Sequence, residues 1–276
     1  MVKNIFIPNC DNLVFIIAEI GINHNGSLDE AIDLVKAAKR SGANAVKFQT
    51  YNTELRTKKN SPIYDILKKC ELKKGDFGKL KDLCDSLDIE FFSTPFDEES
   101  LNLLEDLNVN TYKIASFDIS NKKLLKVVSK TKKKIIFSTG MASLNEIAEI
   151  HDLLKCNTDT IGMLHCISSY PTPENSSRLE NIQFLKNLYP EVTLGYSDHT
   201  SGIYVPVTSV ACGARIIEKH FCLDNDHVCV DKPVSIGEIE FTNMVKEIRN
   251  LEKILGQAKF GIRDEEKEIV QYRRVS

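Results

Sequence analysis

The sequence contains no run of about 18 apolar residues, the length that a membrane-spanning helix requires. Its first residues, Met1–Asn4, lead into a short predicted strand rather than a secretory leader. We therefore expect a soluble cytoplasmic protein with no membrane partner. A large excess of either charge is also missing, because the net charge is -3 and the isoelectric point is near 6.1. This balance argues against a nucleic-acid partner.

The eight cysteines include no CxxC spacing, the pattern typical of zinc and redox sites. Several of them, such as Cys166 and Cys212, lie inside apolar runs. The pattern favours reduced thiols in a reducing compartment over a disulfide framework or a zinc cluster.

The Gly-rich phosphate turn of dinucleotide-binding folds is missing as well. The first predicted strand is followed by GINHNG (Gly21–Gly26), which does not match GxGxxG. Short apolar strands and amphipathic helices instead alternate along the chain. The predicted strands are Val14–Ile20, Ala45–Gln49, Glu90–Thr94, Thr111–Ala115, Lys134–Thr139, Thr160–Cys166, Val192–Tyr196 and Arg215–His220. The predicted helices are Leu28–Arg40, Asp76–Leu87, Glu98–Leu107, Lys122–Lys130, Leu144–Leu154, Leu179–Leu188, Gly202–Ala214 and Gly237–Leu255.

Eight βα units with short connections predict an α/β protein, a (β/α)8 TIM barrel, formed by a single domain over residues 1–276. A chain of 276 residues with 42% hydrophobic residues is long enough to bury such a core. In this fold the active site lies at the carboxyl ends of the strands. Polar residues follow or end all eight predicted strands, so we expect them to converge there.

Two histidines end neighbouring strands in the segment 192–221. His199 follows the seventh strand and His220 ends the eighth, and a crossover helix makes these strands parallel. Two neutral imidazoles side by side, with room for oxygen ligands, are typical of a site for a divalent ion of the first transition row. The alternative for either histidine is an ordinary core or surface position.

Two lysines, Lys47 and Lys113, are predicted to point into the barrel, which is costly unless an anion meets them. Hydroxyls from Thr94, Ser116, Ser138 and Ser197 complete a donor set that suits a phosphate and a carboxylate. Glu19 is a candidate general base. The alternative is a structural network, in which the lysines pair with Glu19 or Glu218.

Eight motifs, in order, resemble the barrel domain of the N-acetylneuraminate (sialic acid) synthase family. That family includes legionaminic and pseudaminic acid synthases and spore-coat polysaccharide homologues. The motifs are AEIGINHNG (Ala18–Gly26), KFQ (Lys47–Gln49), STPF (Ser93–Phe96), YKIAS (Tyr112–Ser116), STGM (Ser138–Met141), SSYPTP (Ser168–Pro173), GYSDHT (Gly195–Thr200) and EKHF (Glu218–Phe221).

The resemblance implies a metal-dependent condensation of phosphoenolpyruvate with an N-acetylmannosamine-type sugar, which gives a nonulosonic acid and phosphate. It implies metal ligation by His199 and His220, with Mn²⁺ expected first and Mg²⁺ or Co²⁺ as alternatives, and a catalytic carboxylate at Glu19. It implies phosphoenolpyruvate contacts at Lys47, Thr94, Lys113, Ser116, Ser138, Ser168 and Ser197. It implies sugar contacts at Gln49, Asn60, Tyr170 and Asp231.

Two departures from the family pattern bear on the sugar site. Lys232 stands where many members carry a histidine, and the sequence ends at Ser276, about where a linker to a small antifreeze-like domain begins in the full-length family. We expect residues 262–276 to be the start of that linker and the domain itself to be absent. In the family this domain caps the partner subunit's barrel and contributes an arginine. We therefore expect a homodimer that uses the sugar poorly unless a separate cap-bearing polypeptide completes the site.

Two other functions remain open from the sequence. One is a catalytically weak or silent barrel that acts as partner or scaffold of another synthase. The other is a phosphoenolpyruvate-condensing barrel of the sugar-phosphate type, which would need an Arg-rich second phosphate site. The sequence shows no such cluster at the predicted strand ends.

Overall fold

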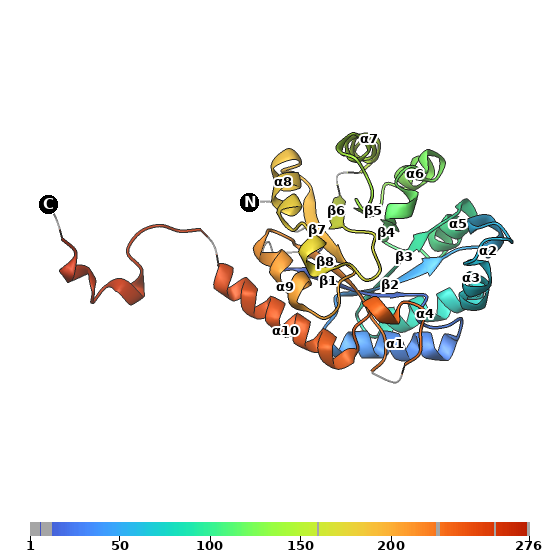
Figure 1. The fold of residues 1–276 in the computed structure, drawn as a ribbon, viewed down its shortest axis with the longest axis horizontal. Helices are drawn as coiled ribbons and strands as arrows, with labels where there is room; N and C mark the ends of the chain where they lie inside the picture. Colours follow the sequence, from blue (N-terminus) through green and yellow to red (C-terminus); the bar gives the residue numbers. More distant parts are fainter. Residues whose placement is uncertain (1–5, 7–12, 159, 225–226, 257, 275–276) are drawn as a thin grey trace.

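The structure is a computed structural model that describes residues 6, 13–158, 160–224, 227–256 and 258–274. Eight parallel strands close into a barrel in chain order, and the last strand pairs with the first. Helices surround the strands (Figure 1). The strands are β1 (Phe15–Gly21), β2 (Ala45–Thr50), β3 (Glu90–Pro95), β4 (Thr111–Ile114), β5 (Lys134–Ser138), β6 (Ile161–Cys166), β7 (Thr193–Asp198) and β8 (Ile216–His220). The predicted TIM barrel is thus confirmed.

One long helix follows each strand, and each begins close to its predicted residue. These helices are α1 (Leu28–Arg40), α4 (Lys74–Ser86), α5 (Glu98–Asp106), α6 (Lys122–Ser129), α7 (Leu144–Lys155), α8 (Glu180–Leu188), α9 (Tyr204–Ala211) and α10 (Glu238–Leu255). Several starts have side-chain caps of the expected type. Ser27 accepts a hydrogen bond from the Glu30 amide, and Ser143 and Glu146 form a capping box at α7.

Some predicted element boundaries were wrong by a few residues. β7 extends to Asp198, beyond its predicted end at Tyr196, because Ser197 and Asp198 continue the ladder with β8. α9 ends at Ala211, because the chain turns at Gly213, whose φ is 104°. Two short helices, α2 (Thr53–Arg56) and α3 (Tyr64–Cys70), were not predicted.

The barrel interior is layered. The part nearer the amino ends of the strands is an apolar cluster of Phe6, Phe15, Ile17, Ala45, Phe92, Ile136, Leu164 and Ile216. Side chains alternate between the two faces of a strand, so Glu19 lies on the same face as Ile17 but one step nearer the carboxyl end. A larger apolar cluster fills the space between the outer face of the strands and the helices. The polar side chains of the strand ends therefore rest on a packed apolar floor.

Residues 258–274 lie outside the barrel, and all of them are exposed. They include two short 3-10 helices, η4 (Asp264–Glu266) and η5 (Val270–Tyr272). Val275 and Ser276, the end of the predicted linker, lie outside the described residues. Within the described part of the chain, no helix is long and apolar enough to cross a membrane.

Candidate active site

A cavity of about 250 Å³ opens at the carboxyl ends of the strands. Every strand, or the segment directly after it, contributes to its wall. The lining residues are Glu19, Ile22, Lys47, Gln49, Arg56, Thr94, Phe96, Lys113, Ala115, Ser116, Phe117, Ser138, Cys166, Tyr170, Ser197, His199, Glu218, His220 and Asp231. This set contains all the predicted site residues except Asn60 and Ser168.

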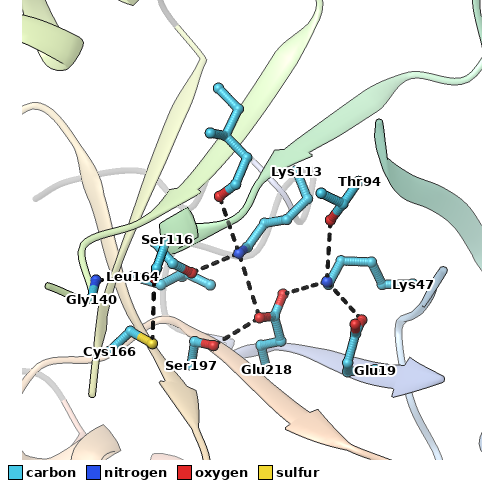
Figure 2. A network of polar contacts seen from close by, with 12 residues as sticks. Glu19, Lys47, Thr94, Lys113, Ser116, Gly140, Leu164, Cys166, Ser197 and Glu218 are labelled. Atoms are coloured by element: carbon cyan, nitrogen blue, oxygen red, sulfur yellow. Dashed lines mark hydrogen bonds and ion pairs between the residues drawn. The ribbon is translucent and has the colours of Figure 1, made fainter. Parts of the chain in front are cut away.

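Two lysines and two carboxylates form a chain of ion pairs across the cavity floor (Figure 2). Lys47 Nζ lies 2.7 Å from Glu19 Oε2 and 3.6 Å from Glu218 Oε2. Glu218 Oε1 lies 3.5 Å from Lys113 Nζ. None of the four side chains is more than 6% exposed. The pairing that the sequence left open as an alternative is therefore present, with Glu218 as the bridge between the lysines.

Burial and ion pairing shift the pKa values of the two carboxyl groups in opposite directions. Burial raises the pKa of Glu19 to about 7, although Lys47 opposes the shift. Burial acts in the same direction on Glu218, but Lys113 and Lys47 outweigh it and hold the Glu218 pKa well below its ordinary value. Glu218 is thus an ionised partner of the lysines, whereas Glu19 can gain or lose a proton near neutral pH.

Hydroxyl groups surround the ammonium groups of the two lysines. Lys113 Nζ donates to Ser138 Oγ at 2.6 Å, and Lys47 Nζ donates to Thr94 Oγ1 at 3.4 Å. Ser197 Oγ donates to Glu218 Oε1 at 2.8 Å. These contacts join β3, β5 and β7 to the ion pairs, so a ligand that reaches the lysines also meets their hydroxyl neighbours.

Gly140, just after β5, allows a close approach of two serines. Its amide donates to Ser116 Oγ at 3.0 Å. A Cβ at this position would lie 2.3 Å from Ser168 Oγ and 2.7 Å from Ser116 Oγ. Ser168 therefore lies against Gly140, and its buried hydroxyl has no hydrogen-bond partner among the described residues.

The two predicted metal ligands lie side by side, with ring centroids 5.3 Å apart. Burial lowers the pKa of both His199 and His220, so both rings are neutral near pH 7. The Nδ1–H of His199 can donate to the Ile167 carbonyl at 2.9 Å, which leaves the lone pair of Nε2 free. His220 Nδ1 is buried without a hydrogen-bond partner in the described residues, and Asp231 Oδ2 lies 3.6 Å away. Neutral rings with free lone pairs and a nearby carboxylate fit a divalent ion.

An aromatic and a cationic side chain border the mouth of the cavity. The Tyr170 ring lies 4.1 Å from the His199 ring, centroid to centroid. Arg56 Nη1 donates to Gln49 Oε1 at 2.9 Å, and its guanidinium lies 3.6 Å from the centroid of the Phe96 ring. This cation–π contact orients a planar donor towards the sugar contacts predicted from the sequence.

The NeuB family model matches residues 34–260, which is most of the chain. This chain belongs to the NeuB family. It is 40% identical to the N,N'-diacetyllegionaminic acid synthase of Legionella pneumophila over 88% of this chain and 73% of that protein. It is 45% identical to the uncharacterized protein MJ1065 of Methanocaldococcus jannaschii over 94% of this chain and 77% of that protein. The predicted family resemblance is thus confirmed.

Among solved structures, the NeuB-family barrel resembles that of the N-acetylneuraminic acid synthetase of Leptospira borgpetersenii, in complex with citrate. The TM-score is 0.94 at 39% identity, and the match covers 99% of this chain and 97% of that chain. Named relatives that are acid synthases make this NeuB-family chain a synthase-like enzyme.

Two residues predicted for the NeuB-family site lie outside the cavity wall, and two charged residues of the wall were not predicted. Asn60 lies in an exposed turn between α2 and α3 and is not part of the cavity wall. Ser168 lies against Gly140 and is not part of the wall. Glu218 and Arg56 line the cavity but were not predicted as binding residues. Glu218 and His220 are two residues apart on one strand, so the sequence could have placed both on the same face. The four-residue helix that carries Arg56 shows no pattern that could have predicted its position.

Proposed function

We propose that this chain condenses phosphoenolpyruvate with an N-acetylmannosamine-type sugar, in a reaction that depends on a divalent metal, to give a nonulosonic acid and phosphate. The observation that carries the proposal is the placement of two buried lysines, their hydroxyl neighbours and two paired histidines in one cavity. An anionic substrate and an aldehyde could both be held there.

Phosphoenolpyruvate carries a phosphate and a carboxylate, which match the charges of Lys47 and Lys113. In the chain itself these charges are met by Glu19 and Glu218. A bound dianionic phosphate competes for the ammonium groups, while Ser138 and Thr94 supply further donors at fixed positions. Because these donors sit on rigid strands, they stabilise developing charge without reorganisation.

Glu19 is the proposed proton acceptor. The enol carbon of phosphoenolpyruvate attacks the sugar aldehyde, whose oxygen takes up a proton, and positive charge develops at the carbon bearing the phosphate. Water adds to that carbon, and a pKa near 7 allows Glu19 to take the proton that the water loses. The resulting tetrahedral intermediate loses phosphate with cleavage of its C–O bond. Lys47 then faces a neutral Glu19, so its charge is more available to the departing phosphate.

His199 and His220 are the proposed metal ligands, and Asp231 Oδ2 lies 3.6 Å from His220 Nδ1. Mn²⁺ suits nitrogen and oxygen ligands, and Mg²⁺ or Co²⁺ are the alternatives. When bound, the ion supplies a Lewis acid for the sugar carbonyl.

A phosphorylated sugar is a second candidate substrate, and Arg56 favours it. Arg56 supplies the only guanidinium among the described residues of the cavity wall, and the described residues provide it with no carboxylate partner within ion-pair distance. A relative from Mus musculus is named N-acetylneuraminate-9-phosphate synthase and is 31% identical over 88% of this chain and 71% of that protein. A single arginine is less than a full second phosphate site, so the unphosphorylated sugar is our first choice.

Phosphate release from phosphoenolpyruvate tests the proposal, with Mn²⁺ and a panel of hexosamine derivatives with and without a terminal phosphate. We expect release only with an acylamino-mannose-type sugar, and little release by Glu19→Gln. Arg56→Met should raise KM for the sugar while phosphoenolpyruvate binding stays unchanged. No release with any sugar, with or without an added antifreeze-like domain and despite normal phosphoenolpyruvate binding, would favour the silent partner or scaffold.

A homodimer, a separate cap-bearing polypeptide and a cytoplasmic location stay predictions from the sequence. Light scattering tests the homodimer. Kinetics with and without an added antifreeze-like domain test the cap, because Arg56 already brings one guanidinium from the chain itself to the cavity mouth. Efficient turnover by the chain alone would show that its own loops complete the sugar site.

A further inference from the structure

Three side chains that the proposed reaction does not use meet in the segment after β8. Cys222 follows the strand closely, and His227 and Cys229 come from further along the same segment. One potential ligand atom from each residue lies within 4.8 Å of the other two. Cys222 is fully buried, and His227 and Cys229 are partly buried. None of the three lines the cavity described above.

We propose that Cys222, His227 and Cys229 form a second metal site, distinct from the paired histidines, that binds Zn²⁺. Two thiolates and an imidazole are ligands that Zn²⁺ prefers. Zn–S and Zn–N bonds place the ligand atoms of a tetrahedral site roughly 3.5–3.8 Å apart. The ligand atoms lie within 4.8 Å of one another, so the cluster needs a contraction of about 1.3 Å at most. Three protein ligands leave the fourth position to water.

The surroundings of His227 prepare its ring for a metal. Its Nε2 lies 3.3 Å from Glu30 Oε2, and its Nδ1 lies 3.2 Å from the Leu223 amide, which donates to it. This pair of contacts selects the tautomer with the proton on Nε2. The Nδ1 lone pair accepts the Leu223 amide hydrogen, so a metal at Nδ1 would replace that hydrogen bond. A carboxylate behind a ligating histidine is a common arrangement at metal sites, because it fixes the ring and increases its basicity.

A lysine also supports one of the sulfur ligands. Lys232 Nζ donates to Cys222 Sγ at 3.5 Å. Two thiolates and a neutral imidazole balance the charge of Zn²⁺, and the ammonium group stabilises the buried sulfur further. Lys232 stands where many family members carry a histidine. In this chain the lysine therefore lies beside the proposed metal ligands.

A metal at this position would close residues 222–229 on themselves, and hydrogen bonds connect this segment and Asp231 to residues between β1 and α1. Asn25 Nδ2 donates to both Glu30 Oε2 and the Val228 carbonyl at 2.9 Å. The Asp231 amide donates to Asn23 Oδ1 at 3.0 Å. We assign this site a structural role, because its three ligands precede Asp231 in the chain and none of them lines the cavity.

Anaerobic titration with Co²⁺, a spectroscopic substitute for Zn²⁺, tests the proposal. The full chain with His199→Ala and His220→Ala should bind one equivalent of Co²⁺ and develop a thiolate-to-cobalt charge-transfer band. Adding Cys229→Ser should abolish the band. Cys156→Ser, at an exposed cysteine beyond α7, is the matched control and should leave the band unchanged.

Absence of the band in the starting protein, or its persistence in Cys229→Ser, would overturn the proposal. So would the finding that Cys222 and Cys229 form a disulfide in the anaerobically purified chain. If Cys229→Ser fails to fold, Glu30→Gln decides the question, because it keeps all three ligands. We expect this variant to bind Co²⁺ about 10–100-fold more weakly, and unchanged affinity would contradict the assignment.

Discussion

Lys47 Nζ lies 2.7 Å from Glu19 Oε2, and both side chains are buried. Removing one member of such a pair leaves an unpaired charge in surroundings of low polarity. Lys47→Met should therefore lower the free energy of unfolding by about 3 kcal/mol. The double variant Lys47→Met/Glu19→Gln should regain part of this loss. Denaturant unfolding of the two proteins measures the difference, and equal stability would show that the pair is not coupled.

The anion site makes a separate prediction about Lys113. Lys113→Met should weaken phosphoenolpyruvate binding by at least about 1.5 kcal/mol, the scale of a hydrogen bond to a charged group. Isothermal calorimetry measures the affinity. Lys122→Met serves as the control, because Lys122 is exposed and pairs with Glu149 outside the cavity. If Lys113→Met binds as tightly as the parent chain, the lysine belongs only to the structural network.

The paired histidines predict a loss of metal binding without a loss of fold. His220→Ala should remove Mn²⁺ binding at the cavity together with activity. The fold should remain intact, because a strand-end residue contributes little to the core. Calorimetry with Mn²⁺ and circular dichroism make the two measurements. The control is His151→Ala, on α7 and outside the cavity wall. Unchanged Mn²⁺ affinity in His220→Ala would remove the histidine from the ligand set.

Acid sensitivity should arise in part from His24. This ring is 1% exposed, and burial lowers its pKa from 6.5 to about 4. The unfolded chain binds the proton more readily, so the stability from neutral His24 is fully present above pH 6.5 and is lost as the pH falls through 4. The loss amounts to about 3 kcal/mol.

Unfolding by denaturant at a series of pH values, for the parent chain and for His24→Gln, measures this contribution. The variant should show a flatter decline between pH 6.5 and 4, because glutamine does not titrate. A decline of the same steepness in both proteins would assign the acid sensitivity to other groups.

The sequence predicted best those features that depend on a local pattern of residues. Short apolar runs predicted the strands, and the residues at their ends predicted most of the cavity wall. The sequence left pairing of the lysines with Glu218 open as an alternative, but the place of Glu218 as the bridge between them depends on how β8 closes against β1 and β7. Arg56 lies on a helix that is too short to show a helical hydrophobic period. Cys222 and Cys229 lie close together although they do not have the CxxC spacing that would have predicted a metal site.

The packed apolar layer beneath the ion pairs determines how molecules can move through the site. Phe92 and Ile136 are among the side chains that fill the barrel below Lys47 and Lys113. A molecule held by the lysines must therefore enter and leave past Tyr170 and Arg56 at the mouth. The sugar proposed to bind near Tyr170 and Arg56 would block that route, so we expect the proposed anionic substrate to bind first.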